Sequence, residues 1–170
     1  IVSEDIKPAI RERGVIVENG QYWRVNVEKA RIRGIESTLD WPLRRGFELG
    51  LNHTWLQARN LGTNEPLTGR PRNTVNARLG WRASNGWSAQ LRASFTGQQY
   101  TAIGRGADRR LETLPSFTLL NLGVGKQIGQ RLTLRAGVEN LTNLQLQDKS
   151  EHFGYAERGR FYYLSLEGRL

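Results

Sequence analysis

Apolar and polar residues alternate along most of the chain, in segments that are separated by polar stretches. The segments cover residues 35–43, 47–55, 75–83, 87–96, 120–125, 132–139 and 162–167. Within 87–96, for example, Trp87, Ala89 and Leu91 are each followed by a polar residue. Successive side chains of a β-strand point to opposite faces, so this alternation predicts strands rather than helices. The pattern therefore predicts an all-β fold of about seven antiparallel strands.

The connections between the segments alternate between short and long. Tight hairpin turns that contain glycine are expected at 44–46, 84–86 and 129–131. Longer polar connections lie at 59–73, 100–117 and 145–159, and residues 1–20 are expected to form another long loop. Short turns at one rim of a sheet and long loops at the other are typical of outer-membrane β-barrels.

Alternation alone leaves two architectures open, a soluble β-sandwich and a transmembrane β-barrel. Strands of roughly nine to twelve residues are long enough to cross a bilayer when tilted. Aromatic residues near the expected strand ends would form belts at the membrane surface. They are Trp41, Trp55, Trp81, Trp87 and Phe95. These features, with the consecutive hairpin order, favour an antiparallel up-and-down transmembrane β-barrel, of which about seven strands are visible.

The composition narrows the chemistry that the chain can perform. It carries 25 Lys and Arg residues against 16 Asp and Glu, a formal net charge of +9. Most of these cations are arginines that stand singly between apolar residues, whereas nucleic-acid readers cluster them, so no nucleic-acid partner is expected. Cys is absent and the only histidines are His53 and His152. No metal site, cofactor or catalytic site is therefore expected.

In a barrel, the polar side of each strand faces the lumen. The charged residues expected there are Glu36, Arg78, Arg82, Arg92, Arg135 and Glu139. Two inward carboxylates could suggest acid–base chemistry, but no nucleophile or histidine shares their face. We expect Glu36 and Glu139 to form cross-strand ion pairs with arginines such as Arg78, Arg92 or Arg135.

Four sequence segments carry a family resemblance. They are NVEKARIRGIE at 26–36, LTGRPRNTVN at 67–76, LTLRAGVENLTN at 132–143 and GRFYYLSL at 159–166. By their order and spacing, the chain from about Gln21 to Leu170 resembles the C-terminal part of a TonB-dependent outer-membrane receptor, most like the ferric-siderophore receptors. Such receptors are 22-stranded barrels plugged by an N-terminal domain. The resemblance implies that 1–170 is a C-terminal barrel segment, with 1–20 an extracellular loop and the plug domain absent.

The resemblance also implies a function. The whole receptor would lie in the cell outer membrane of a Gram-negative bacterium, in contact with its lipid and lipopolysaccharide. It would take up a ferric siderophore or another anionic iron chelate without acting as an enzyme, and would meet the TonB complex through the missing plug. The chelate class stays open. A stand-alone small barrel, either an adhesin or an enzyme, and a soluble β-sandwich binding module remain alternatives.

Two loops hold the candidate ligand-binding residues. Arg105, Arg109 and Arg110 could capture an anionic chelate by charge, or could contact lipopolysaccharide or stay solvated. Tyr155 and Arg158, beside Phe153, form an aromatic and basic loop that could stack on a catecholate or haem. Asn140 and Asn143 are expected to cap the exit of a strand into this second loop.

Overall fold

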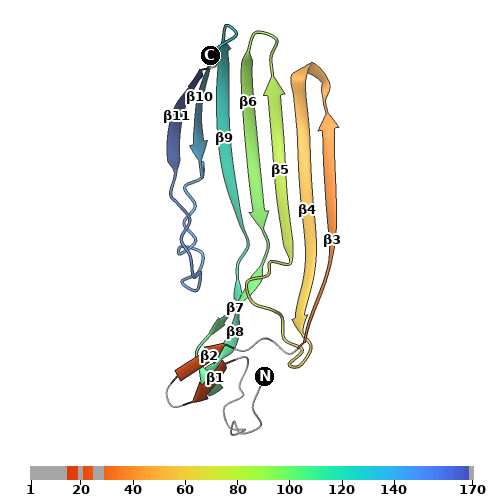
Figure 1. Cartoon of the computed structure of the whole chain (residues 1–170), viewed down its shortest axis with the longest axis vertical. Helices are drawn as coiled ribbons and strands as arrows, with labels where there is room; N and C mark the ends of the chain where they lie inside the picture. Colours follow the sequence, from red (N-terminus) through yellow and green to blue (C-terminus); the bar gives the residue numbers. More distant parts are fainter. Residues whose placement is uncertain (1–14, 19–20, 25–28, 169–170) are drawn as a thin grey trace.

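The computed structural model describes residues 15–18, 21–24 and 29–168 and is dominated by one antiparallel sheet (Figure 1). Its seven strands lie in the order β11-β10-β9-β6-β5-β4-β3. Their bounds are β3 (Ala30–Pro42), β4 (Phe47–Asn60), β5 (Asn73–Arg82), β6 (Trp87–Thr96), β9 (Phe117–Ile128), β10 (Leu132–Glu139) and β11 (Phe161–Gly168). The seven predicted strands are confirmed, and β3, β4 and β9 extend beyond their predicted ends.

Two short hairpins lie outside the main sheet. β1 (Val15–Glu18) pairs with β2 (Gln21–Arg24), and β7 (Gln99–Ile103) pairs with β8 (Arg110–Leu114). β7 and β8 lie largely within the stretch 100–117, where the sequence predicts a long loop. β1 falls inside the expected loop 1–20, and the remainder of that stretch lies outside the described residues. In the part of the chain that the structure describes, no helix is long and apolar enough to cross a membrane.

The two rims of the sheet differ as the sequence predicts. The tight turns β3–β4, β5–β6 and β9–β10 lie together at the upper end in Figure 1, and the long connections lie at the lower end. In the first turn, which contains η2 (Arg44–Gly46), Arg45 and Gly46 both have positive φ, 60° and 80°. A Cβ atom on Gly46 would lie 2.0 Å from the carbonyl oxygen of Arg82, so this turn requires glycine.

Strand register separates an apolar face from a polar face. One row across the sheet aligns Trp41, Leu49, Leu79, Leu91 and Leu122, and the next row aligns Asp40, Gly50, Arg78, Arg92 and Asn121. The apolar face is largely exposed, and Leu164, for example, is 73% exposed. A contiguous apolar surface of this extent needs an apolar environment, which a bilayer supplies.

The residues predicted to share the apolar face do so. They are Leu39, Trp41, Leu49, Leu51, Leu79, Leu91, Leu122, Leu134, Leu164 and Leu166. Aromatic residues bound this face at both ends. Trp41, Phe47, Trp81 and Trp87 lie toward the short turns, and Trp55 and Phe95 lie toward the long connections. Lys126 Nζ lies 5.1 Å from the ring centre of Trp87 and donates to the carbonyl oxygen of Asn85. These contacts place the charged ammonium group at the turn rim.

Candidate functional site

The polar face carries the charged residues that the sequence analysis assigned to the lumen. The register aligns Glu36, Arg78, Arg82, Arg92, Arg135 and Glu139 on this one face. Arg78 and Arg92 are directly opposite each other on β5 and β6. Like charges in such a cross-strand pair repel, so each needs a counter-charge or solvent.

Two of the arginines on this face, Arg78 and Arg135, find acidic partners, and these differ from the expected ones. The guanidinium of Arg78 lies 3.8 Å from the Asp40 carboxylate and 4.0 Å from that of Glu48. Arg135 forms an ion pair with Glu167 across β10 and β11. Gly50 stands between Arg78 and Asp40 in the ladder, and its missing side chain lets the two meet above the backbone.

The expected pairing of Glu36 and Glu139 with arginines is therefore wrong. Within the described residues, neither carboxylate takes part in an ion pair. Glu36 stands opposite Thr54, and Glu139 stands opposite Phe161. Arg78 and Arg135 instead pair with acids in their own or an adjacent row, because cross-strand distance selects the partner.

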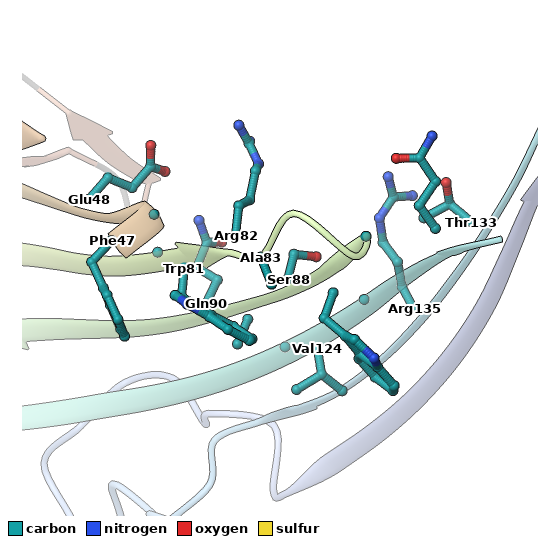
Figure 2. Close-up of a pocket in the computed structure, with 18 of the residues that line it drawn as sticks. Phe47, Glu48, Trp81, Arg82, Ala83, Ser88, Gln90, Val124, Thr133 and Arg135 are labelled. Carbon is teal, nitrogen blue, oxygen red and sulfur yellow. The ribbon is translucent and has the colours of Figure 1, made fainter. Parts of the chain in front are cut away.

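A hollow of about 810 Å³ indents the sheet near the short turns (Figure 2). On the polar face its lining includes Glu48, Arg82, Gln90, Arg135 and Tyr163. In Figure 2, Glu48, Arg82 and Arg135 rise from one side of the sheet, while Phe47 and Val124 lie on the other.

Glycines create the room for this hollow. One polar-face row runs through Glu48, Gly80, Gln90, Gly123, Gly137 and Tyr163. The side chain of Glu48 covers Gly80, where an added Cβ would lie 2.8 Å from its Cγ. The ring of Tyr163 covers Gly137, where an added Cβ would lie 2.5 Å from its Cζ. Side chains at these glycines would fill the space that Glu48 and Tyr163 now occupy.

The three candidate arginines of the first loop lie on the β7–β8 hairpin around η3 (Gly106–Asp108). Arg109 Nη1 lies 3.4 Å from Glu65 Oε2, which links the hairpin to the β4–β5 connection. Arg110 Nε lies 3.2 Å from Glu112 Oε1 on the same strand. Arg105 is exposed and forms no ion pair with any described residue. The structure brings the three residues together, but pairing reduces the charge available for an anionic ligand.

The β10–β11 connection folds against the polar face instead of standing free. Leu146 is fully buried and Phe153 is 5% exposed, and both pack with Leu114 and Phe117. The ring of Phe153 meets that of Phe117 edge-on at 5.9 Å. Phe117 stands opposite Thr96, which places this cluster on the polar side of the sheet. Phe153 therefore anchors the loop and is not presented to a ligand.

Tyr155 and Arg158 remain accessible on this anchored loop. The ring of Tyr155 packs edge-on against Phe153 at 5.9 Å, yet the residue is 47% exposed. The guanidinium of Arg158 lies 5.0 Å from the ring centre of Phe161, and Arg158 is exposed. The contact with Phe153 restricts the orientation of the Tyr155 ring and leaves the side chain accessible.

Two asparagines close the neck of this loop. Asn140 is 5% exposed, and its Nδ2 donates to the carbonyl oxygens of Leu144 and Arg158, both at 2.9 Å. Its Oδ1 accepts from the Leu144 N–H at 2.8 Å. Asn143 Oδ1 accepts from the Arg160 N–H at 2.8 Å. The predicted capping role of Asn140 and Asn143 is confirmed, and these bonds join both ends of the loop.

The described part of the chain contains no group of three or more His, Asp or Glu side chains that could hold a metal ion. What the arrangement offers is a basic and aromatic rim above a charged, hollowed face. The positive charge of this rim can attract anions.

The strands expose an apolar face bounded by aromatic belts and carry charged residues on the opposite face, and short turns alternate with long connections. Together these features define a segment of a transmembrane β-barrel of the outer-membrane type. Residues 10–141 match the family model described as TonB dependent receptor-like, beta-barrel. The chain belongs to this family, and its place is the outer membrane of a Gram-negative bacterium.

Relatives and solved structures agree with this assignment. The ferric enterobactin receptor of Pseudomonas aeruginosa is 32% identical over 158 residues, with 83% of this chain and 21% of the relative covered. The iron-regulated outer membrane virulence protein of Vibrio cholerae is 28% identical over 148 residues, with 85% and 22% covered. The siderophore receptor PirA from Acinetobacter baumannii has the same fold, with a TM-score of 0.70, 21% identity, and 91% and 25% coverage. The chain spans about a fifth of the length of these curated relatives, and its strands do not close a barrel.

Proposed function

We propose that this chain is the C-terminal part of the barrel of a receptor for TonB-dependent uptake of a ferric siderophore or a similar anionic iron chelate. Residues 1–20 would belong to an extracellular loop, and the plug would lie elsewhere in the protein. The observation that carries the proposal is 32% identity over 158 residues to a relative named as a ferric enterobactin receptor. In this role the chain makes and breaks no covalent bond.

The geometry suggests which part of the barrel binds the chelate and which part lines its route inward. The long-loop rim receives the chelate through Arg105, the neighbouring Arg109 and Arg110, and the exposed Tyr155 and Arg158. The polar face continues below this rim and lines the route inward with charged side chains. The TonB complex acts through the plug and supplies the energy for release of the chelate inward.

Deleting the gene of the intact receptor is expected to abolish growth on one class of iron chelate in iron-limited medium. Ferric catecholate, ferric hydroxamate and haem serve as separate arms, with radiolabelled uptake as the measurement. A protonophore is expected to abolish the receptor-dependent uptake, because TonB coupling requires the proton gradient. Unchanged uptake in every arm, or uptake that resists the protonophore, would contradict the proposed function.

Replacing Arg105, Arg109 and Arg110 together by alanine is expected to lower the association rate of an anionic ferric chelate at low salt. A reduction of about threefold to tenfold is expected, because three charges are lost but two are already paired. The difference should fade near physiological ionic strength, where exposed charges are screened over about 8–10 Å. Arg105→Ala alone is expected to give much of the reduction.

The control for this experiment removes the same charge at the opposite rim, with Arg44→Ala, Arg45→Ala and Arg131→Ala. Stopped-flow binding to the intact receptor in detergent gives the rate for each variant. An association rate at low salt that matches the unmodified receptor would reject the capture role of the hairpin, while leaving uptake itself untouched.

A further inference from the structure

Two hollows follow each other along the polar face of the sheet. The larger, of about 810 Å³, is the turn-end hollow, and the smaller, of about 440 Å³, is the middle hollow beside the mid-points of β5 and β6. The lining of the middle hollow includes Arg78, Arg92, Asn76 and Ser94. Gln90, in the lining of the turn-end hollow, is two residues from Arg92 on β6, about 7 Å along the strand. The two hollows are therefore neighbours on one wall.

Each hollow contains an arginine that has no acidic partner among the described residues. Arg92 in the middle hollow and Arg82 in the turn-end hollow are exposed, and neither forms an ion pair with any described residue. Arg78 stands opposite Arg92, and its guanidinium lies 3.8 Å from the Asp40 carboxylate and 4.0 Å from that of Glu48. Long, solvent-exposed ion pairs of this kind contribute little, so the middle hollow keeps a positive charge.

The other lining residues leave room and offer hydrogen bonds. Asn76 and Ser94 are opposite each other in the row next to the arginine pair of the middle hollow. In the turn-end hollow, Ser88 and Gly125 follow Arg82 in one polar-face row, so short side chains lie beside its guanidinium. Volumes of about 440 and 810 Å³ fall within the range of small-molecule sites, which is roughly 300–1,000 Å³. Both hollows are therefore large enough for a small anionic molecule.

We propose that the β5–β6 wall carries two successive transit sites for the anionic iron chelate, the first at Arg92 in the middle hollow and the second at Arg82 in the turn-end hollow. The inference rests on the proposed function and names where the chelate travels after it leaves the long-loop rim. An anion that enters the lumen loses part of its hydration, and an unpaired guanidinium replaces the lost water with charge-assisted hydrogen bonds.

The spacing of the two sites suits stepwise passage. Arg78, directly opposite Arg92, is four residues from Arg82 on β5, about 13 Å along the strand. Several sites of moderate strength let an ion enter a passage and also leave it, whereas a single strong site would retain it. The second site lies toward the short turns, which mark the periplasmic end of an outer-membrane barrel and hence the end at which the chelate leaves.

The transit sites act on passage and not on capture. Arg82 and Arg92 lie on strands of the main sheet, whereas Arg105, Arg109 and Arg110 lie on the β7–β8 hairpin at the long-loop rim. Loss of the transit sites should therefore slow the uptake of the chelate and leave the affinity of the receptor for it unchanged.

The test is the double variant Arg82→Gln and Arg92→Gln in the intact receptor, produced in cells that lack the unmodified gene. The probe is the radiolabelled ferric chelate that the unmodified receptor imports. Its Kd is measured on cells without a proton gradient, and its uptake rate is measured on energised cells at saturating chelate. The uptake rate is expected to fall about tenfold, which is the effect of losing one charge-assisted hydrogen bond, while the Kd changes by less than about twofold.

Two control variants accompany this experiment. Arg82→Lys and Arg92→Lys keep the positive charge, and are expected to retain most of the uptake rate. Arg31 and Arg59 stand opposite each other in the rows of the apolar face, outside the lumen. Arg31→Gln and Arg59→Gln therefore remove the same number of charges from the other side of the sheet, and are expected to leave the uptake rate unchanged.

Several results would overturn the transit sites. They are an uptake rate in the Gln variant equal to that of the unmodified receptor, an equal loss in the apolar-face control, or an equal loss in the Lys variant. Sensitivity of the Gln variant to a large antibiotic that the outer membrane excludes would show that the two arginines hold the plug instead, and would also overturn the proposal. If the double variant does not fold and so binds no chelate, Arg92→Gln alone is judged by the same criteria.

The same measurements separate this inference from the function on which it rests. Absence of energised uptake by the unmodified receptor contradicts the proposed function, and the transit sites fall with it. Normal uptake by both the unmodified receptor and the Gln variant rejects the transit sites alone.

Discussion

Replacing Asn140 by alanine is expected to release the β10–β11 connection from the polar face of the sheet. Alanine removes both Nδ2 donors and the Oδ1 acceptor that hold Leu144 and Arg158 at the loop neck. Asn140 also has a φ of 48°, a left-handed conformation that asparagine tolerates better than alanine. Both effects act in the same direction, against the closed loop.

The expected size of the effect is about 3 kcal/mol on loop closure, from unsatisfied buried groups and backbone strain together. This corresponds to about a hundredfold larger population of the open loop. Protease cleavage within 141–159 tracks that population when opening and closing are fast. Limited proteolysis of the intact receptor, with mass-spectrometric mapping of the cut sites, therefore measures the change.

Asn140→Asp is the matched variant for this experiment. Aspartate keeps the acceptor for the Leu144 N–H and the tolerance of positive φ, but it sets a buried carboxylate oxygen against the Leu144 and Arg158 carbonyl oxygens. A cleavage rate at least as high as that of Asn140→Ala is therefore expected. Cleavage elsewhere in the barrel should not change. A rate in Asn140→Ala equal to that of the unmodified receptor would mean that the Leu146 and Phe153 contacts alone hold the loop.

The sheet could be predicted from the sequence because each of its strands has one consistently apolar side. Trp41, Leu49 and Leu79 belong to three strands, and each shows the same alternation with its sequence neighbours. The Gly-containing turns then fix the hairpin order, and hence the row in which these residues meet. Strand ends were less predictable, because β3, β4 and β9 continue past the apolar band, where alternation fades.

Partners across strands and between loops could not be predicted. Glu65 and Arg109 are 44 positions apart, and the residues around each of them do not predict their ion pair. The β7–β8 hairpin lies where charged and small residues mask any alternation. The sequence predicts that Phe153 belongs to a ligand-facing aromatic loop, because it does not show that Leu114 and Phe117 pack against this ring. Each of these depends on three-dimensional proximity rather than on local pattern.

The packing of side chains over the strand glycines could not be predicted from the sequence either. Gly80, Gly123 and Gly137 appear in the sequence as weak points in alternating segments, since glycine lacks a side chain to pack. In the structure they share one polar-face row with Glu48, Gln90 and Tyr163, and the side chains of Glu48 and Tyr163 lie over them. An aromatic ring over a cross-strand glycine restores packing at that position and fixes the register.

Gly137→Ala is therefore expected to destabilise the barrel by displacing Tyr163. The added Cβ would lie 2.5 Å from both Cζ and Oη of the ring, too close for either to remain in place. Overpacking of this kind costs about 1–3 kcal/mol of unfolding free energy. Denaturant unfolding of the intact receptor in lipid vesicles, followed by tryptophan fluorescence, measures the loss.

A double-mutant cycle separates the ring contact from other effects of the substitution. Tyr163→Ala removes the ring. In that background, the loss of unfolding free energy caused by Gly137→Ala should be smaller by about 1 kcal/mol or more. Gly154→Ala serves as the control, because a Cβ at Gly154 would meet no atom within 4 Å, and it is expected to be nearly neutral. If Gly137→Ala costs the same with and without the Tyr163 ring, the close approach of ring to glycine does not set the strand packing. A coupling of the expected sign would show that the missing side chain at Gly137 makes room for the Tyr163 ring.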